Sequence, residues 1–187
     1  MIAILFVTAG CANDSSNTAG ENSESSGELG SRAEVTEGDF VYRLVSEKPA
    51  YGKDEKIVLY AELEYVGKKA EVKIAHAASP FYFPMKELTR GYEIVYSMDQ
   101  PRIITTLKKG EVLKELYRGS GGYSSEDAKP FVDFIKAVSE AQQKGTLPEG
   151  EYEVYGAADF EQVDEHSDER QGERIHVKSE IRFVMGK

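Results

Sequence analysis

Two residues near the middle of the chain could act as a nucleophile and a base. His76 and Ser79 lie close together in the sequence HAASP, and acidic residues elsewhere could orient the imidazole. However, Ser79 precedes Pro80, where a hydroxyl usually bonds to the local backbone, and no glycine-flanked nucleophile elbow surrounds it. A structural histidine and a turn serine are therefore the favoured interpretation, and an envelope hydrolase using His76 is the alternative.

A second group of polar residues could bind a metal ion. The segment 161–173 holds several carboxylates around one imidazole, and its candidate ligands are Asp164, His166 and Asp168. Such oxygen and nitrogen donors suit calcium or a transition metal. The spacing lacks the regular aspartates and the central glycine of an EF-hand. We therefore expect a solvated loop between the last two strands and no cofactor, with a metal-binding protein as the alternative.

Three glycines could form a phosphate-binding loop. Gly119, Gly121 and Gly122 follow a predicted strand and precede a predicted helix, which is the position such a loop would occupy. The lysine and the hydroxyl residue of a Walker motif are absent from this stretch. A mobile connector is the favoured interpretation.

Aromatic residues are concentrated between two prolines in SPFYFPM. Phe81, Tyr82 and Phe83 alternate in direction if this segment is a strand, so Tyr82 faces away from its neighbours. The favoured interpretation is an edge strand whose rings fill the core while the prolines block further pairing. The alternative is an exposed recognition patch formed by the three rings, and it is the strongest of the candidate binding sites.

The elements that must position these residues are mostly strands. The clearest runs from Ile57 to Tyr65, where residues alternate as expected of a strand with one wet face. A glycine-containing turn at 66–69 and a partner strand at 72–77 predict a hairpin. Further short strands are predicted at 40–46, 81–85, 92–96, 103–107, 112–117, 152–160 and 175–185.

One segment has helical rather than strand periodicity. Phe131, Phe134, Ile135 and Val138 share one face of a predicted amphipathic helix between residues 127 and 144. Ser124 with Asp127 could cap its start, and Gly145 suits its end. The many short strands with a single helix predict an antiparallel sandwich into which one α-helix is inserted near 125–144.

The strand KIVLYAELEYVG (56–67) and the turn sequences LKKGE (107–111) and LPEGEYEVYG (147–156) resemble those of immunoglobulin-like sandwiches. They are similar in particular to the domain of the bacterial intracellular proteinase inhibitor, which recurs in exported proteins of Gram-positive bacteria. The resemblance implies a mainly β, antiparallel immunoglobulin-like sandwich spanning 39–187 as a single domain. The chain has no tryptophan and carries a helical insertion, so no inhibitory residues are carried over.

The start of the chain predicts an anchor. The single cysteine, Cys11, follows a short apolar run, and FVTAGC resembles the lipobox of bacterial lipoproteins, whose cysteine carries the lipid. Residues 1–11 are thus a partial lipoprotein signal, and the polar stretch 12–38 is a disordered linker. Thr8 replaces the usual leucine. The positively charged n-region is also missing, and a start codon placed too far downstream would explain this second departure. A short buried strand with an incidental cysteine is the alternative.

The charge of the chain disfavours two classes of partner. The formal net charge is -10, with acidic residues spread along the chain, so no basic stripe is left for nucleic acid or for anionic lipid headgroups. We therefore expect a lipid-anchored protein on the extracytoplasmic face of the cell membrane. It is expected to be a non-enzymatic binding module whose ligand is a protein, a peptide or an envelope polymer.

Overall fold

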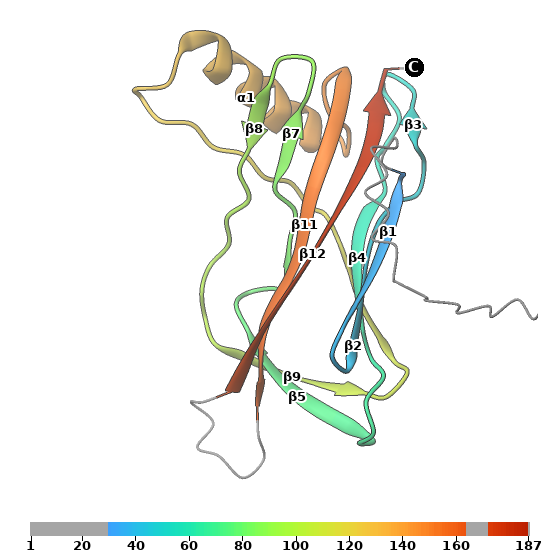
Figure 1. The fold of residues 1–187 in the computed structure, drawn as a ribbon. Helices are drawn as coiled ribbons and strands as arrows, with labels where there is room; N and C mark the ends of the chain where they lie inside the picture. The colour runs from blue at the N-terminus through green and yellow to red at the C-terminus, as the bar shows by residue number, and fades with distance from the viewer. Residues whose placement is uncertain (1–29, 164–171, 187) are drawn as a thin grey trace, which may run out of the picture.

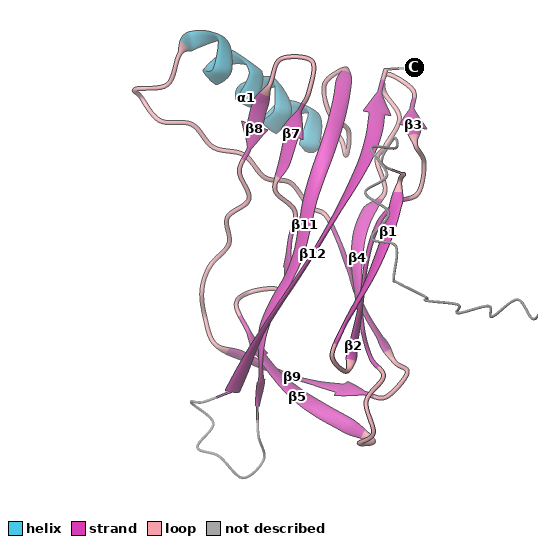
Figure 2. Ribbon diagram, viewed as in Figure 1, coloured by secondary structure: helices cyan, strands magenta, loops and turns pink. Residues whose placement is uncertain are grey.

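The computed structural model describes residues 30–163 and 172–186, and these form two β-sheets and one helix (Figures 1 and 2). The strands are β1 (Arg32–Glu37), β2 (Phe40–Ser46), β3 (Ala50–Tyr51), β4 (Leu59–Tyr65), β5 (Glu71–His76), β6 (Phe81–Tyr82), β7 (Met85–Glu87), β8 (Tyr92–Ile94), β9 (Ile103–Lys108), β10 (Val112–Leu116), β11 (Gly150–Val163) and β12 (Gly172–Met185). The helix is α1 (Lys129–Gln142). The prediction of a mainly β protein with antiparallel sheets is confirmed.

The small sheet has four strands in the order β1-β2-β4-β10, all antiparallel. Its first strand corrects the sequence analysis, which assigned residues 12–38 to a disordered linker. Residues 32–37 pair along their whole length with β2, and Ala33 and Val35 pack against the core. The alternation of these two small apolar residues with polar ones is a short strand signal, and pairing with β2 makes it stable.

The large sheet has eight strands and is built around the long antiparallel hairpin β11–β12. On the other side of β11, three short segments follow one another, namely β7, β6 and β5. β9 extends the sheet beyond β5, β8 pairs with β7, and β3 runs parallel to the end of β12. Figure 1 shows the hairpin running the length of the molecule. β11 is therefore a central strand with neighbours on both sides.

The predicted hairpin between residues 57–65 and 72–77 is wrong. β4 belongs to the small sheet and β5 to the large one, so residues 66–70 carry the chain between sheets. The turn after β9 also carries the chain from one sheet to the other. In this turn the Gly110 amide donates a hydrogen bond to the Tyr65 carbonyl at 3.0 Å. Gly67 has no room for a Cβ because the side chains of Asp39 and Tyr65 occupy that position. Local alternation indicates a strand but not the sheet to which it belongs.

Side chains from both sheets fill one core. Phe40 on β2 meets Phe160 on β11 edge to face, with ring centroids 4.9 Å apart. Tyr42 on β2 stacks with Phe81 on β6 at 6.3 Å. Side chains of β2 fill the space beside Gly156 of β11, where a Cβ would lie 2.6 Å from both the Leu44 Cδ2 and the Tyr42 Oη atoms. These contacts show which residues of β11 point into the core. Because side chains alternate along a strand, the residues between them point toward solvent.

Helix α1 lies against the β7–β8 end of the large sheet (Figure 2). The rings of Phe131 and Phe134 contact Tyr92 at centroid distances of 5.5 and 5.3 Å. The predicted helix is confirmed, although Asp127 accepts a hydrogen bond from the Ser124 amide in a preceding turn and does not cap the helix itself. In the part of the chain that the structure describes, no helix has the length and apolar character needed to cross a membrane.

A fully buried carboxylate stabilises the turn between β7 and β8. Glu87 accepts hydrogen bonds from the backbone amides of Thr89 and Arg90 at 2.9 and 2.8 Å, and the Arg90 guanidinium lies 3.2 Å away. Burial by itself would raise the pKa of Glu87, but the hydrogen bonds from Thr89 and Arg90 outweigh it and hold the pKa below its usual value. The folded state therefore favours the charged form of Glu87.

This geometry predicts how acid affects stability. A carboxyl whose folded pKa is below its unfolded value, roughly 4.3 for glutamate, adds stability above the unfolded pKa and loses it as pH falls through the folded one. We expect Glu87→Gln to be less stable than wild type at pH 7, and the difference to shrink as pH falls from 6 toward 3. Urea unfolding at each pH measures the free energy of unfolding of wild type and of Glu87→Gln. A difference that stays constant over this interval would contradict the assigned role.

Candidate functional site

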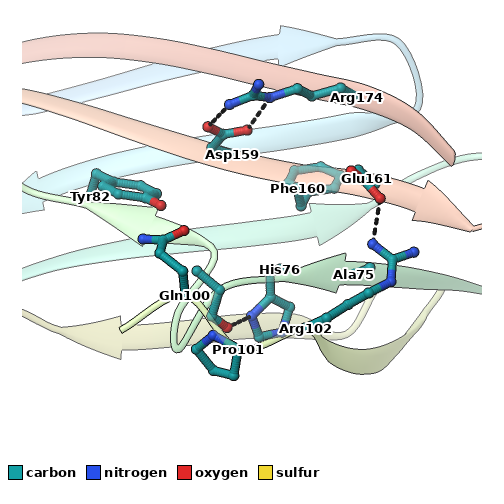
Figure 3. Close-up of a pocket in the computed structure, with 11 residues that line it drawn as sticks. Ala75, His76, Tyr82, Gln100, Pro101, Arg102, Asp159, Phe160, Glu161 and Arg174 are labelled. Carbon is teal, nitrogen blue, oxygen red and sulfur yellow. Dashed lines mark hydrogen bonds and ion pairs between the residues drawn. The ribbon is translucent and has the colours of Figure 1, made fainter. Parts of the chain in front are cut away.

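The outer face of the large sheet is hollowed around Tyr82. Two cavities of about 220 and 440 Å³ meet there and share Tyr82 and Asp159 in their walls. Together we call them the Tyr82 trough, which is lined by residues of β5, β6, β11 and β12 and of the loop before β9. Figure 3 shows the smaller of the two cavities.

Strand alternation explains which side chains reach the trough. Val154, Ala158 and Phe160 of β11 point into the core, so Ala157 and Asp159 point the other way. Ala157 stands opposite Tyr82 of β6 on one side and Lys178 of β12 on the other. A methyl group between two long side chains leaves a depression, and this row forms the floor and two walls of the larger cavity.

Asp159 is the most strongly bound carboxylate in the trough. The Arg174 guanidinium donates two hydrogen bonds to it, at 3.0 and 2.7 Å, and His176 Nδ1 lies 3.5 Å away (Figure 3 shows the arginine pair). The hydrogen bonds from Arg174 hold the pKa of Asp159 below its usual value against a smaller opposing effect of burial. Asp159 is therefore an anionic acceptor positioned at the junction of the two cavities.

The smaller cavity has a second ion pair across it. Arg102, in the loop before β9, donates to Glu161 of β11 at 2.5 Å. Gln100 extends toward Tyr82 from the same loop (Figure 3). Residues of β5, β6, β11 and β12 and of the loop before β9 thus meet at this cavity.

His76 lines the smaller cavity but does not form a pair with Ser79. Its Nδ1 donates to the Ala77 carbonyl at 2.8 Å, and its Nε2 lies 2.8 Å from the Thr105 hydroxyl. The Ser79 hydroxyl accepts a hydrogen bond from the Phe81 amide at 2.9 Å. These bonds agree with the favoured interpretation of a structural histidine and a turn serine, because the ring nitrogens and the hydroxyl all have other partners.

The proposed three-ring patch is wrong for two of its members. Phe81 and Phe83 are 0% and 1% exposed and lie in the core. Tyr82 is half-buried on the outer face, where its ring contacts Tyr96 edge to face at 6.1 Å. The favoured interpretation that the phenylalanine rings fill the core is therefore confirmed, and Tyr82 is the one ring of the three that lines the trough.

The glycine loop lies against the side of the helix. Gly121 would place a Cβ 3.6 Å from Ile135, which is in the second turn of α1, and Gln142 donates to the Ser120 carbonyl at 2.9 Å. These contacts hold Gly119 and Gly121 beside the middle and the end of α1, whereas a phosphate-binding loop precedes the first turn of its helix. The connector interpretation therefore fits this segment.

Several predicted site residues cannot be placed. Cys11, Asp164, His166 and Asp168 lie outside the described residues. Among residues 30–163 and 172–186, no group of three or more histidine, cysteine or acidic side chains is arranged to hold a metal ion.

Sequence reasoning singled out Tyr82 and His76 but not the charged residues around them. Asp159, Arg174 and Lys178 lie on the last two strands, where charged residues alternate with apolar ones, and this pattern indicates only a wet face. Which charges meet depends on the register between β11 and β12. No family model, curated protein or solved structure matches this chain.

Proposed function

We propose that this protein is a non-enzymatic binding module, held on the outer face of a bacterial cell membrane by a lipid on Cys11, that contacts its ligand through the Tyr82 trough. The observation that carries the binding role is the trough itself. It is an open depression in which a tyrosine ring, an anionic acceptor and a lysine meet on rigid strands. Concave sites that combine apolar surface with a few fixed polar groups are typical of ligand-binding sites.

The engagement of His76 and Ser79 favours binding over hydrolysis. A hydrolase of the predicted type needs the serine hydroxyl within hydrogen-bond reach of the imidazole. Here the imidazole bonds to Ala77 and Thr105, and the serine hydroxyl accepts a bond from its own turn.

The fold belongs to the same proposal. We infer that the two sheets form an immunoglobulin-like sandwich similar to the domain of the bacterial intracellular proteinase inhibitor. The antiparallel strands and the core shared between the sheets support this. The function proposed for this chain rests on its trough and not on the fold.

The anchor rests on the sequence around Cys11. Small residues precede this cysteine, and a polar segment separates it from β1. A lipid there would tether the domain near the membrane and leave the trough open to envelope components. One acyl chain binds membranes weakly, so the two or more chains of a lipoprotein are needed for stable attachment.

Fatty-acid labelling tests the anchor. We expect the protein expressed from its own gene to incorporate an alkyne-bearing palmitate analogue and to sediment with membranes. Cys11→Ala should lose the label and leave the membrane fraction, because no other thiol is available in this sequence. Ser16→Ala, a change in the polar segment, is the control and should behave as wild type. An unlabelled wild-type protein in the cytosol would overturn the anchor.

Co-sedimentation with isolated cell envelopes tests the binding role. The full chain, produced without lipid, is expected to sediment with envelopes, and Tyr82→Ala should weaken this binding about tenfold, as loss of a central aromatic contact commonly does. Tyr123→Ala is the matched control because Tyr123 is 50% exposed and lies outside the trough. Equal binding by wild type and Tyr82→Ala would contradict a role for the trough.

A further inference from the structure

We propose that the ligand of the Tyr82 trough is an acidic saccharide, whose ring lies against Tyr82 and Pro84 and whose carboxylate pairs with Lys178. This inference rests on the proposed binding function and adds the chemical class of the ligand. It is carried by three features of the larger cavity, which are an unpaired cation, an apolar wall and side chains able to bind hydroxyl groups.

The first feature is the charge state of the outer face. Arg174 is paired with Asp159, Arg182 with Glu153 at 2.8 Å, and Arg102 with Glu161. Lys178 is exposed and, within the part of the chain that the structure describes, has no ion-pair partner. Its cross-strand neighbour is Ala157, which carries no charge. Glu180, two residues further along β12, lines the same cavity but forms no ion pair with Lys178, so an anionic ligand group could approach this ammonium without displacing a bound carboxylate.

The second feature is the wall facing Lys178. Tyr82 and Pro84 both line the cavity on the β6 side, and contact with Tyr96 holds the tyrosine ring in place. Tyr155 also lines the cavity, and its hydroxyl donates to Glu153, which raises the pKa of Tyr155 to about 12. Tyr155 therefore stays neutral at physiological pH. A pyranose ring has an apolar C–H face that can lie against such aromatic and proline surface.

The third feature is the set of polar groups between these walls. Asp159 is anionic and has two oxygens at the edge of the cavity, and the exposed His176 imidazole lies beside it. A carboxylate accepts several hydrogen bonds, so Asp159 has acceptor capacity beyond its two bonds from Arg174. Sugar hydroxyls both donate and accept, which matches a carboxylate next to an imidazole.

The position of the trough argues against an extended peptide as the ligand. Peptides that add to a sheet use the free backbone groups of an edge strand. The trough lies on the face of β11, whose backbone is paired with β12 on one side and with β5, β6 and β7 on the other. Recognition here must use side chains. A net charge of -10 also disfavours a long polyanion, so a short acidic oligosaccharide fits best.

Calorimetry with a galacturonic acid tetramer and its neutral methyl ester tests this inference on the full chain produced without lipid. We expect wild type to bind the acid about tenfold more tightly than the ester, because only the acid can pair with Lys178. Lys178→Gln should bind both forms equally. Tyr82→Ala should weaken binding of both about tenfold. Lys73→Gln, at an exposed lysine of β5 outside the trough, should retain the wild-type preference.

The outcomes separate this inference from the proposed function. If the ester binds as tightly as the acid, or if a hexaglutamate peptide displaces the acid at equal concentration, the acidic saccharide is excluded. The binding module then still stands provided that envelope binding depends on Tyr82. If neither saccharide binds and envelope binding is the same in Tyr82→Ala, both proposals fail. Unchanged thermal midpoints of the variants show that each result reflects the trough and not the fold.

Discussion

Phe81→Ala is expected to lower the free energy of unfolding by about 3–5 kcal/mol, the usual cost of truncating a buried phenylalanine. The side chain is 0% exposed and stacks against Tyr42 of the opposite sheet with an interplanar angle of 28°. Its removal leaves a cavity where the two sheets meet, and the neighbouring strands can fill this cavity only partly. Urea unfolding at pH 7, followed by tyrosine fluorescence and far-ultraviolet circular dichroism, measures the change.

The neighbouring Tyr82→Ala variant is the matched control for this experiment. Tyr82 follows Phe81 directly and points to the opposite face of the large sheet. It is half-buried on the outer side of that sheet. Its truncation should cost clearly less stability while it weakens ligand binding. Similar losses of stability for Phe81→Ala and Tyr82→Ala would mean that both rings are in the core. Tyr82 would then not form a wall of the trough.

Gly156→Val is expected to cost about 3 kcal/mol of stability, at the upper end of the usual penalty for overpacking a core. A Cβ at this position would lie 2.6 Å from the Leu44 Cδ2 and Tyr42 Oη atoms. Neither neighbour can move aside easily, because both are 0% exposed. The expected readout is a lower midpoint of urea unfolding with an unchanged slope, which indicates loss of stability without a change in cooperativity.

Ala157→Val makes the same kind of change one residue later on the opposite face. Ala157 points into the larger cavity, about 440 Å³ in volume, so the added methyl groups have space. This variant should remain close to wild type in stability, and it should weaken ligand binding because it raises the floor of the trough. If the Gly156 and Ala157 variants were equally stable, the close approach of β11 to β2 would be wrong.

Some elements could be read from the sequence because their signals are local. The strand predicted at 40–46 has the observed bounds of β2, and the helix predicted between 127 and 144 contains α1, which runs from Lys129 to Gln142. In each case the apolar residues recur with the period of the element that forms, because one face must be buried. Even the wrong hairpin had its strands near their observed positions, 59–65 and 71–76.

The pairing of strands, and the sheet to which each strand belongs, could not be predicted from local periodicity. Residues 32–37 contain only two modest apolar side chains and become a strand because β2 is available to pair with them. The chain passes from the small sheet to the large one after β4, through Gly67, where the side chains of Asp39 and Tyr65 leave no room for a Cβ. Both outcomes depend on contacts between segments that the sequence pattern does not relate to one another.

The sequence by itself determined the mainly β composition of the domain, the position of its helix and the outward direction of Tyr82 between two inward phenylalanines. Only the tertiary structure decided that Ala157 lies between Tyr82 and Lys178, and that His76 and Ser79 bond elsewhere. The physical reason is that periodicity along one strand sets the direction of each side chain, whereas pairing between strands sets its neighbours. A binding site on a sheet surface is made of such neighbours.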